Sequence, residues 1–234
     1  MGFARYLSGI DPATEVPPQG VLPSRRRRRP PYIYSPHEIS TLLDGMRALE
    51  SPRRALTYTT LFGLLAATGM RVGEALTLDS TDIDWDHNIL LIRESKFGKS
   101  RYIPIHQSTS QALQNYSQVR DTYNPKPDNP SFFVSLTGRR IIYESAWPTF
   151  AHIRETTGIG RQAPTPPRIH DLRHTFAVTV LVQWYRNGDD VAARLPWLST
   201  SLGHREPNST YWYLSAAPEL LALAASRLEP TPAR

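Results

Sequence analysis

One stretch in the last third of the chain limits most strongly what this sequence can fold into. It begins with IHDLRHTFA, continues through an apolar segment and ends with LGHREPNSTYWYL. His170 and Arg173 are three residues apart, so they share one face of a helix. Gly203 has the position of a helix cap, and His204 follows it directly. With the phenol of Tyr213 nine residues beyond His204, these side chains indicate a phosphate-handling site with a tyrosine nucleophile.

The charge of the chain favours a polyanionic partner. Its 234 residues carry a formal net charge of +6, with a sequence pI of about 9.7. Nucleic acid is favoured over a membrane because the sequence has no basic amphipathic anchor and no apolar run long enough to span a bilayer. Cysteine is absent, which excludes disulfides and thiolate metal sites. No signal peptide precedes the fold, and these features fit a cytoplasmic location.

The first 31 residues read as a short helix followed by a linker. Phe3 to Leu7 has the composition of a helix end, and prolines cluster between Asp11 and Pro31. Five consecutive arginines lie within this linker, and they predict either an arm that follows DNA phosphates or a solvated run of charge. These residues are Arg25, Arg26, Arg27, Arg28 and Arg29.

Two helices with clear start signals follow the linker. Ser35 to Glu38 is a capping box with proline at the first helical position. Ser51 and Pro52 open a second helix, which Gly69 ends. Arg71 comes directly after this glycine, where a tight backbone turn suits a fixed ligand contact. The alternative is a surface arginine that pairs with Glu74.

A small antiparallel sheet is expected next. A hairpin at Ser95 to Lys99 carries Lys96 and Lys99 near its tip, and Pro104 places the last strand at an edge. The expected strands are Ile83 to Trp85, Ile89 to Ile92 and Arg101 to Ile105.

The remaining chain is predicted to be helical. Ser108 is expected to cap one helix, and Pro148 to lie in the first turn of another, from about Ser145 to Thr157. The central helix runs from His170 to about Arg186, with Phe176, Val180 and Trp184 facing inward. The last two are Val191 to Leu202, broken at Pro196, and an amphipathic helix from Glu219 to Leu228.

Six residues in this order and spacing resemble the tyrosine recombinases, also called phage-type integrases. The most specific matches are ATGMR, IHDLRH and LGH with the tyrosine nine residues on, and their tail YWYLS is similar to integrases of bacterial mobile elements. The residues that carry the resemblance are Arg71, Lys96, His170, Arg173, His204 and Tyr213.

The resemblance implies an α+β, mainly helical catalytic domain with a small antiparallel sheet. We expect it to span residues 32–214, followed by a C-terminal helix and tail at 215–234. It also implies double-stranded DNA as the partner and a tetramer on that DNA, held by the C-terminal helix, with no metal and no cofactor. Family members usually carry a helical core-binding domain first. Residues 1–31 are too short for one, so we expect a chain that is shortened at its N-terminus.

The residue types fit cleavage through a 3′-phosphotyrosyl intermediate. Without a metal, fixed cations must stabilise the charge of the transition state, and the guanidinium groups of Arg71 and Arg173 suit this role. His204 donates to a phosphate oxygen, and His170 assists the nucleophile Tyr213 as a base. The resemblance implies Lys96 as the acid that protonates the leaving group.

Three other interpretations stay open. A type IB topoisomerase shares this chemistry, although the spacing from LGH to the tyrosine favours a recombinase. An accessory DNA-binding fragment with an inactive site would retain DNA binding alone. His170 to His174 also mimics the HExxH pattern of zinc hydrolases, but no clear third ligand follows it.

Overall fold

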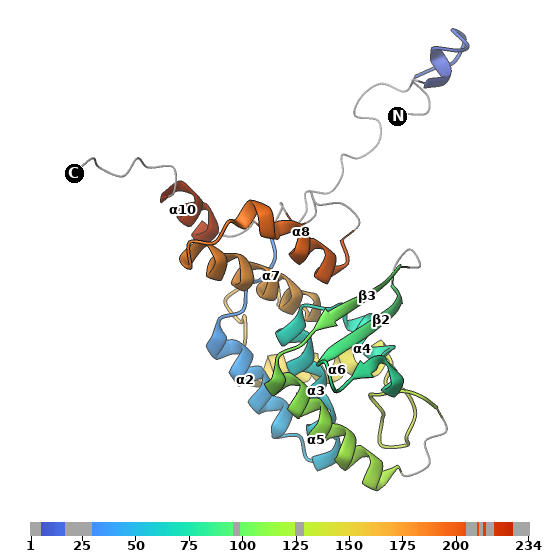
Figure 1. Cartoon of the computed structure of the whole chain (residues 1–234), viewed down its shortest axis with the longest axis vertical. Helices are drawn as coiled ribbons and strands as arrows, with labels where there is room; N and C mark the ends of the chain where they lie inside the picture. The colour runs from blue at the N-terminus through green and yellow to red at the C-terminus, as the bar shows by residue number, and fades with distance from the viewer. Residues whose placement is uncertain are drawn as a thin grey trace, which may run out of the picture. The chain divides into compact units, whose positions relative to one another are not determined.

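The computed structural model describes residues 6–16, 30–95, 99–124, 129–204, 210, 213 and 218–226. The chain divides into two compact units, residues 1–30 and residues 31–234. The candidate site lies wholly in the second unit, which is drawn with labelled elements in Figure 1. Lys96 and the five linker arginines lie outside the described residues, as does the side chain of Lys99.

The second unit is mainly helical with a small antiparallel sheet, which confirms the predicted fold class. None of the described helices is both long and apolar enough to cross a membrane. The helices are α2 (Pro36–Arg47), α3 (Pro52–Thr68), α4 (Val72–Leu76), α5 (Gln107–Tyr123), α6 (Tyr143–Thr157), α7 (Ile169–Arg186), α8 (Val191–Leu202) and α10 (Pro218–Ser226). The strands are β1 (Ile83–Asp84), β2 (Ile89–Ser95) and β3 (Lys99–Pro104).

The first two helices begin where their local signals predicted. The Ser35 hydroxyl accepts a hydrogen bond from the backbone N–H of Glu38, and the Glu38 carboxylate accepts one from the N–H of Ser35. At the start of α3 the Ser51 hydroxyl accepts a hydrogen bond from the backbone N–H of Arg54, and Gly69 ends this helix in the left-handed conformation with a φ of 62°. The exit from α3 is thereby fixed immediately before Arg71.

The sheet has the order β1-β2-β3, with antiparallel neighbours. Leu90 on β2 pairs with Ile103 on β3, and both side chains are buried. Pro104 lies on the edge strand, as expected from its missing N–H.

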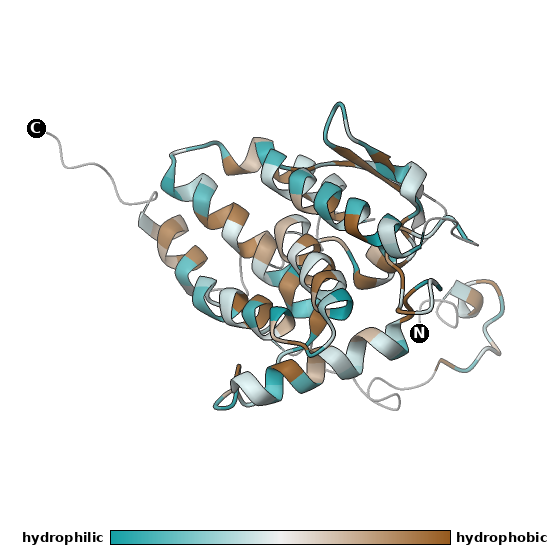
Figure 2. Ribbon diagram, turned by 90° about the horizontal axis from the view of Figure 1, so that it is seen from below, coloured by the Kyte–Doolittle hydropathy of each residue, from teal (hydrophilic) through white to brown (hydrophobic). Residues whose placement is uncertain are grey.

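Two hydrophobic clusters form the core, and α7 contributes to both. Ile169 and Leu172 at its start belong to a large cluster with α2, α3, α5, α6 and the sheet. Ala177 and Leu181 further along belong to a second cluster with α8 and α10. In Figure 1, α7, α8 and α10 lie together above α2, α3 and α5, and Figure 2 shows hydrophobic and hydrophilic residues alternating along the helices. Arg173 and His174 therefore stand at the junction of the two clusters.

Three predicted details are wrong. Helix α5 begins at Gln107, because the ring of His106 rather than Ser108 is the cap. Helix α6 begins at Tyr143 without a side-chain cap, so Pro148 lies inside it and not in its first turn. Helix α8 is not broken at Pro196, because the buried side chains of Leu195, Leu198 and Leu202 hold it against the second cluster.

The inward face of α7 is also broader than predicted. Phe176, Val180 and Trp184 are only partly buried, whereas Val178 and Leu181 are fully buried. The reason is that α7 packs against α3, α8 and α10, so more than one of its faces is covered. A single apolar stripe underestimates the burial of such a helix.

Candidate active site

Two helix ends that are capped by glycine form the base of the site. Helix α3 ends at Gly69 and α8 ends at Gly203, both in the left-handed conformation. A Cβ atom would lie 2.4 Å from a ring carbon of Phe176 at Gly69, and 2.8 Å from Nη1 of Arg101 at Gly203. Both positions therefore require glycine. The last carbonyl groups of a helix have no partner within it and carry partial negative charge, so each end can receive cations.

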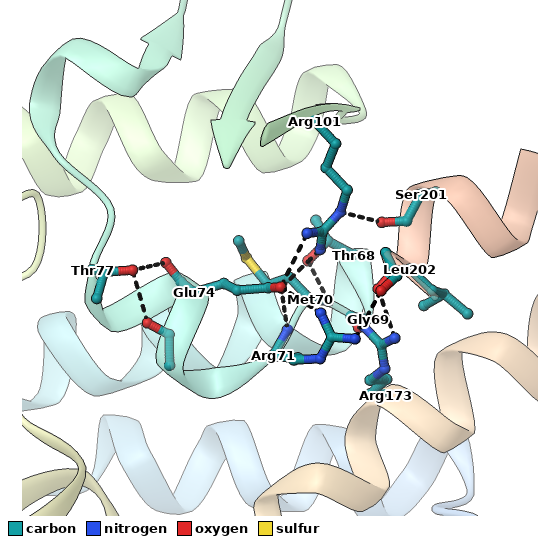
Figure 3. Close-up of polar contacts among 12 residues, drawn as sticks. Thr68, Gly69, Met70, Arg71, Glu74, Thr77, Arg101, Arg173, Ser201 and Leu202 are labelled. Carbon is teal, nitrogen blue, oxygen red and sulfur yellow. Dashed lines mark hydrogen bonds and ion pairs between the residues drawn. The ribbon is translucent and has the colours of Figure 1, made fainter. Parts of the chain in front are cut away.

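The two predicted arginines bind these helix ends. Nη1 of Arg173 donates to the carbonyl oxygen of Gly69 (3.0 Å) and its Nη2 to that of Leu202 (2.6 Å). Nη2 of Arg71 donates to the carbonyl oxygen of Gly203 (2.8 Å). Figure 3 shows the guanidinium groups of Arg71 and Arg173 converging on this point. The structure thus brings together two cations that are 102 positions apart in sequence.

Burial and mutual repulsion act on these cations. Arg173 is only 2% exposed, and burial together with the charge of Arg71 lowers its pKa to about 10. Arg173 therefore remains protonated at neutral pH. Two like charges at this distance need compensation, and the helix carbonyls supply part of it.

Glu74 supplies the rest of the compensation. Its carboxylate accepts from Nη1 of Arg71 (2.7 Å), and from both Nη1 (3.0 Å) and Nη2 (2.7 Å) of Arg101. Arg101 also donates from Nε to the carbonyl oxygen of Ser201 (2.8 Å). Although burial alone would raise the pKa of Glu74, the hydrogen bonds from Arg101 and Arg71 hold it below its ordinary value. The expected pairing of Arg71 with Glu74 is thus present, but as part of the site.

Sequence reasoning did not identify Arg101. The one available signal was strand alternation, since Arg101 falls on the same face as the buried Ile103. An arginine on the apolar face of a strand needs a buried partner, and that partner is Glu74.

The histidines and the tyrosine meet beside these arginines. Nδ1 of His174 lies 3.2 Å from the hydroxyl of Tyr213, which is 2% exposed. The ring of His170 contacts that of His174 edge to face, with centroids 4.7 Å apart. The ring of His204 lies nearly parallel to that of Tyr213, with centroids 6.0 Å apart, and its Nδ1 is 2.7 Å from the hydroxyl of Thr210.

The structure therefore changes the expected order of contacts. His170 was expected beside Tyr213, but His174 makes the contact with the Tyr213 hydroxyl. No local sequence pattern predicts this contact, because it joins residues 39 positions apart. His170 contacts the ring of His174 through its own ring, and among the described residues no hydrogen bond joins His170 to the phenol.

Both imidazoles are shifted toward their neutral form. Burial, followed by the charge of Arg173, lowers the pKa of His170 to about 4. Burial, followed by repulsion from His170, lowers the pKa of His174 to about 4 as well. At neutral pH each ring is uncharged and can accept a proton.

The start of α7 is held rigidly. The Asp171 carboxylate accepts from the backbone N–H of Arg168 (2.8 Å) and from its Nη2 (2.8 Å). This fixes the first turn, from which His170 and Arg173 project. Among the described residues, no three His, Asp or Glu side chains come together as a possible metal site.

Comparisons with known proteins agree with this geometry. Residues 34–219 match the model of the phage integrase family. The putative integrase/recombinase y4rB of Sinorhizobium fredii is 42% identical, over 97% of this chain and 74% of its own length. The tyrosine recombinase XerD of Brucella suis is 30% identical, over 91% of this chain and 68% of its own. The crystal structure of XerA recombinase superposes with a TM-score of 0.67 at 25% identity, and covers 87% of this chain and 67% of its own. The chain therefore belongs to the phage integrase family, together with the tyrosine recombinases.

Proposed function

We propose that this chain cuts and rejoins double-stranded DNA through a covalent 3′-phosphotyrosyl intermediate on Tyr213. The observation that carries the proposal is the convergence of one buried phenol, two arginines and three histidines at the end of α8. In particular, the Tyr213 hydroxyl lies 3.2 Å from a histidine nitrogen. Family membership supports the same reaction class.

The reaction is a transfer of one phosphoryl group between oxygens. The phenolic oxygen of Tyr213 attacks the phosphorus, and the bond from phosphorus to the 5′ oxygen breaks. The 3′ phosphate stays on the tyrosine, and the leaving 5′ oxygen takes up a proton. Attack by a 5′ hydroxyl from either strand reverses the step and rejoins the DNA, so no external energy source is needed.

The arginines stabilise the charge that develops on the phosphate. A guanidinium has five N–H donors, and the contacts of Arg71 and Arg173 with helix carbonyls use only some of them. The remaining donors suit the non-bridging phosphate oxygens, and His204 adds a third donor. Their positions are set before DNA arrives, which avoids reorganisation during the reaction.

We assign the base to the histidine pair. His174 accepts the phenolic proton, because it is neutral at pH 7 and within hydrogen-bond reach. His170, which is the more exposed of the two rings, supports it from the solvent side. The leaving-group acid is Lys96, on the β2–β3 hairpin that Arg101 ties to the site.

A suicide DNA substrate tests the proposal. We expect the wild-type chain to form a covalent adduct and Tyr213→Phe to form none, because phenylalanine lacks the attacking oxygen. Mass spectrometry should place the adduct on Tyr213. The matched control is Tyr211→Phe, two residues earlier, which should still form the adduct.

Undiminished trapping by Tyr213→Phe would refute the assignment of the nucleophile. DNA binding without any adduct in the wild type would favour the accessory-fragment interpretation. Relaxation of one supercoiled duplex without exchange between two duplexes would favour the topoisomerase.

The proposed tetramer on DNA rests on the C-terminal helix. In this chain α10 packs on its own α7, with Leu220 buried and an ion pair between Arg186 and Glu219 (2.7 Å). Leu221 on the same helix is exposed. Light scattering of the chain on a two-site DNA measures the number of copies.

A further inference from the structure

A cavity lies at the far end of α3 from the candidate active site. It has a volume of about 620 Å³ and is bounded by the first turns of α3, the second half of α5, residues 134–138 and the start of α6. At about 1.5 Å per residue, the fifteen positions from Arg53 to Thr68 separate the two sites by roughly 22 Å. Its volume is typical of small-molecule sites.

The described lining of the cavity carries positive charge and no negatively charged side chain. Arg53, Arg54 and Arg120 line it, and none of the described lining residues is Asp or Glu. Arg120 already pairs with Asp121 (2.7 Å). Arg53 and Arg54 occupy the first turn of α3, which contains no acidic residue, so the partial charge of the helix N-terminus adds to theirs.

Neutral groups hold these two arginines in place. The guanidinium of Arg53 lies over the ring of Tyr123 (4.8 Å), and that of Arg54 over the ring of Tyr58 (5.7 Å). Nη2 of Arg54 donates to the hydroxyl of Thr149 (3.2 Å). These contacts orient the cations without cancelling their charge, which preorganises them for an anion.

Part of the cavity lining is apolar and unusually exposed. Val119, Tyr123 and Leu136 line the cavity and are 40%, 61% and 47% exposed. Large apolar side chains that are grouped and exposed indicate a binding site. The cavity therefore offers an apolar wall next to a cationic one.

We propose that this cavity binds a small organic anion with an aromatic or apolar body and a single carboxylate or phosphate head group. The head group pairs with Arg53 and Arg54, and the body packs against Val119 and Tyr123. This site is independent of the DNA-cleaving site.

Titration calorimetry on the full chain tests the proposal with four probes. The two anions are 1-naphthoate and 1-naphthyl phosphate, and the controls are the neutral 1-naphthalenemethanol and inorganic phosphate. We expect at least one anion to bind with a Kd at least tenfold below those of both controls, because only it has body and charge together. The tighter of the two identifies the head group.

Two variants locate the binding. Arg53→Gln/Arg54→Gln should weaken anion binding at least tenfold, and Val119→Trp, which fills the cavity, should abolish it. The matched control is Arg47→Gln/Arg186→Gln, which removes two exposed arginines elsewhere and should leave Kd unchanged. Thermal unfolding shows whether each variant is folded, and all variants should still form the adduct on suicide DNA.

Equal affinity for the anions and the neutral alcohol would overturn the proposal, as would unchanged anion binding by Arg53→Gln/Arg54→Gln. No anion binding by the wild type, with weaker duplex binding by the double variant, would instead assign these arginines to DNA.

Discussion

Arg173 connects the ends of two helices through a single side chain. Its guanidinium bridges the carbonyl oxygens of Gly69 and Leu202, which belong to the ends of two different helices. An ammonium group is a compact point charge and cannot span two acceptors in this fixed geometry. The position therefore requires the shape of arginine as well as its charge.

Arg173→Lys is expected to slow covalent adduct formation at least a hundredfold while duplex affinity changes little. Loss of one oriented donor to a transition-state oxyanion costs about 2.7–4 kcal/mol. The measurement is the single-turnover rate at saturating suicide DNA, with thermal unfolding to confirm that the variant is folded. A rate within about threefold of wild type, in a folded variant, would show that Arg173 lacks the proposed role.

His174 makes the free energy of unfolding depend on pH. The sign of this dependence follows from the lowered pKa of His174, which is about 4 against an ordinary value of about 6.5. Between these values the unfolded chain binds a proton that the folded chain does not. The stabilising contribution is therefore fully present above pH 6.5 and is lost as the pH falls toward 4. Urea unfolding from pH 7 to pH 4.5 should show a shallower loss for His174→Asn than for wild type.

The control for this experiment is His152→Asn, which replaces an exposed histidine on α6 and should keep the wild-type slope. Identical slopes for His174→Asn and wild type would mean that His174 does not stay neutral in the folded chain.

For single residues, the sequence predicted those side-chain positions that depend only on spacing within one segment. His170 and Arg173 share a face because three residues separate them on a helix. The contact of His174 with Tyr213 and that of Arg101 with Glu74 join distant segments, so only the packed structure reveals them.

At the scale of elements, Glu74 joins three parts of the site. It stands on α4, accepts from Arg71 beside it and from Arg101 on β3, and Arg101 in turn bonds the end of α8. The hairpin that carries the proposed acid is thereby tied to the arginines that we propose bind the phosphate.

Glu74→Gln should lower the free energy of unfolding by about 3–5 kcal/mol, because it leaves two partly buried guanidinium groups without their carboxylate. Glu219→Gln is the matched control. It removes an exposed pair with Arg186, whose side chains are 54% and 65% exposed, and should cost at most about 1 kcal/mol. Urea unfolding measures both. Equal losses for the two variants would show that the buried network adds no stability.

Local signals predicted the elements well where one residue decides the backbone. Ser35, Ser51 and Gly69 begin and end their helices as expected. The prediction failed at Pro196, because tertiary packing stabilises α8 by more than the lost hydrogen bond costs. It failed at His106 because an imidazole nitrogen replaced the usual hydroxyl as cap.

At the scale of the whole molecule, the site lies where the two hydrophobic clusters meet on α7. Tyr213 belongs to the second cluster, and α3, whose end binds Arg173, belongs to the first. Packing within both clusters therefore fixes the distance between the Tyr213 phenol and the guanidinium groups of Arg71 and Arg173. No single segment of the sequence encodes that distance.

Charge is the other property of the whole molecule that bears on function. The chain carries a formal net charge of +6, and five of its arginines are Arg25 to Arg29. We propose these five arginines and Lys99 as DNA contacts, on the grounds of the sequence alone. Contacts with phosphate release condensed counterions, so they make duplex affinity fall with salt at a slope of about 0.9 per phosphate neutralised.

Replacement of Arg25 to Arg29 with glutamine should therefore weaken binding about equally on all duplex sequences and reduce the salt slope by up to about 4.5. The measurement is duplex affinity by fluorescence anisotropy between 50 and 200 mM salt, a range over which several phosphate contacts change affinity by orders of magnitude. Arg47→Gln/Arg186→Gln is the control, because it removes exposed arginines from the folded unit. If the arginine run is only a solvated charge, its glutamine variant will keep the wild-type slope, and affinity will shift no more than in the control. A reduced salt slope with an unchanged single-turnover cleavage rate at saturating DNA would show that these arginines contribute to binding of the DNA phosphates and not to the cleavage step proposed for Tyr213.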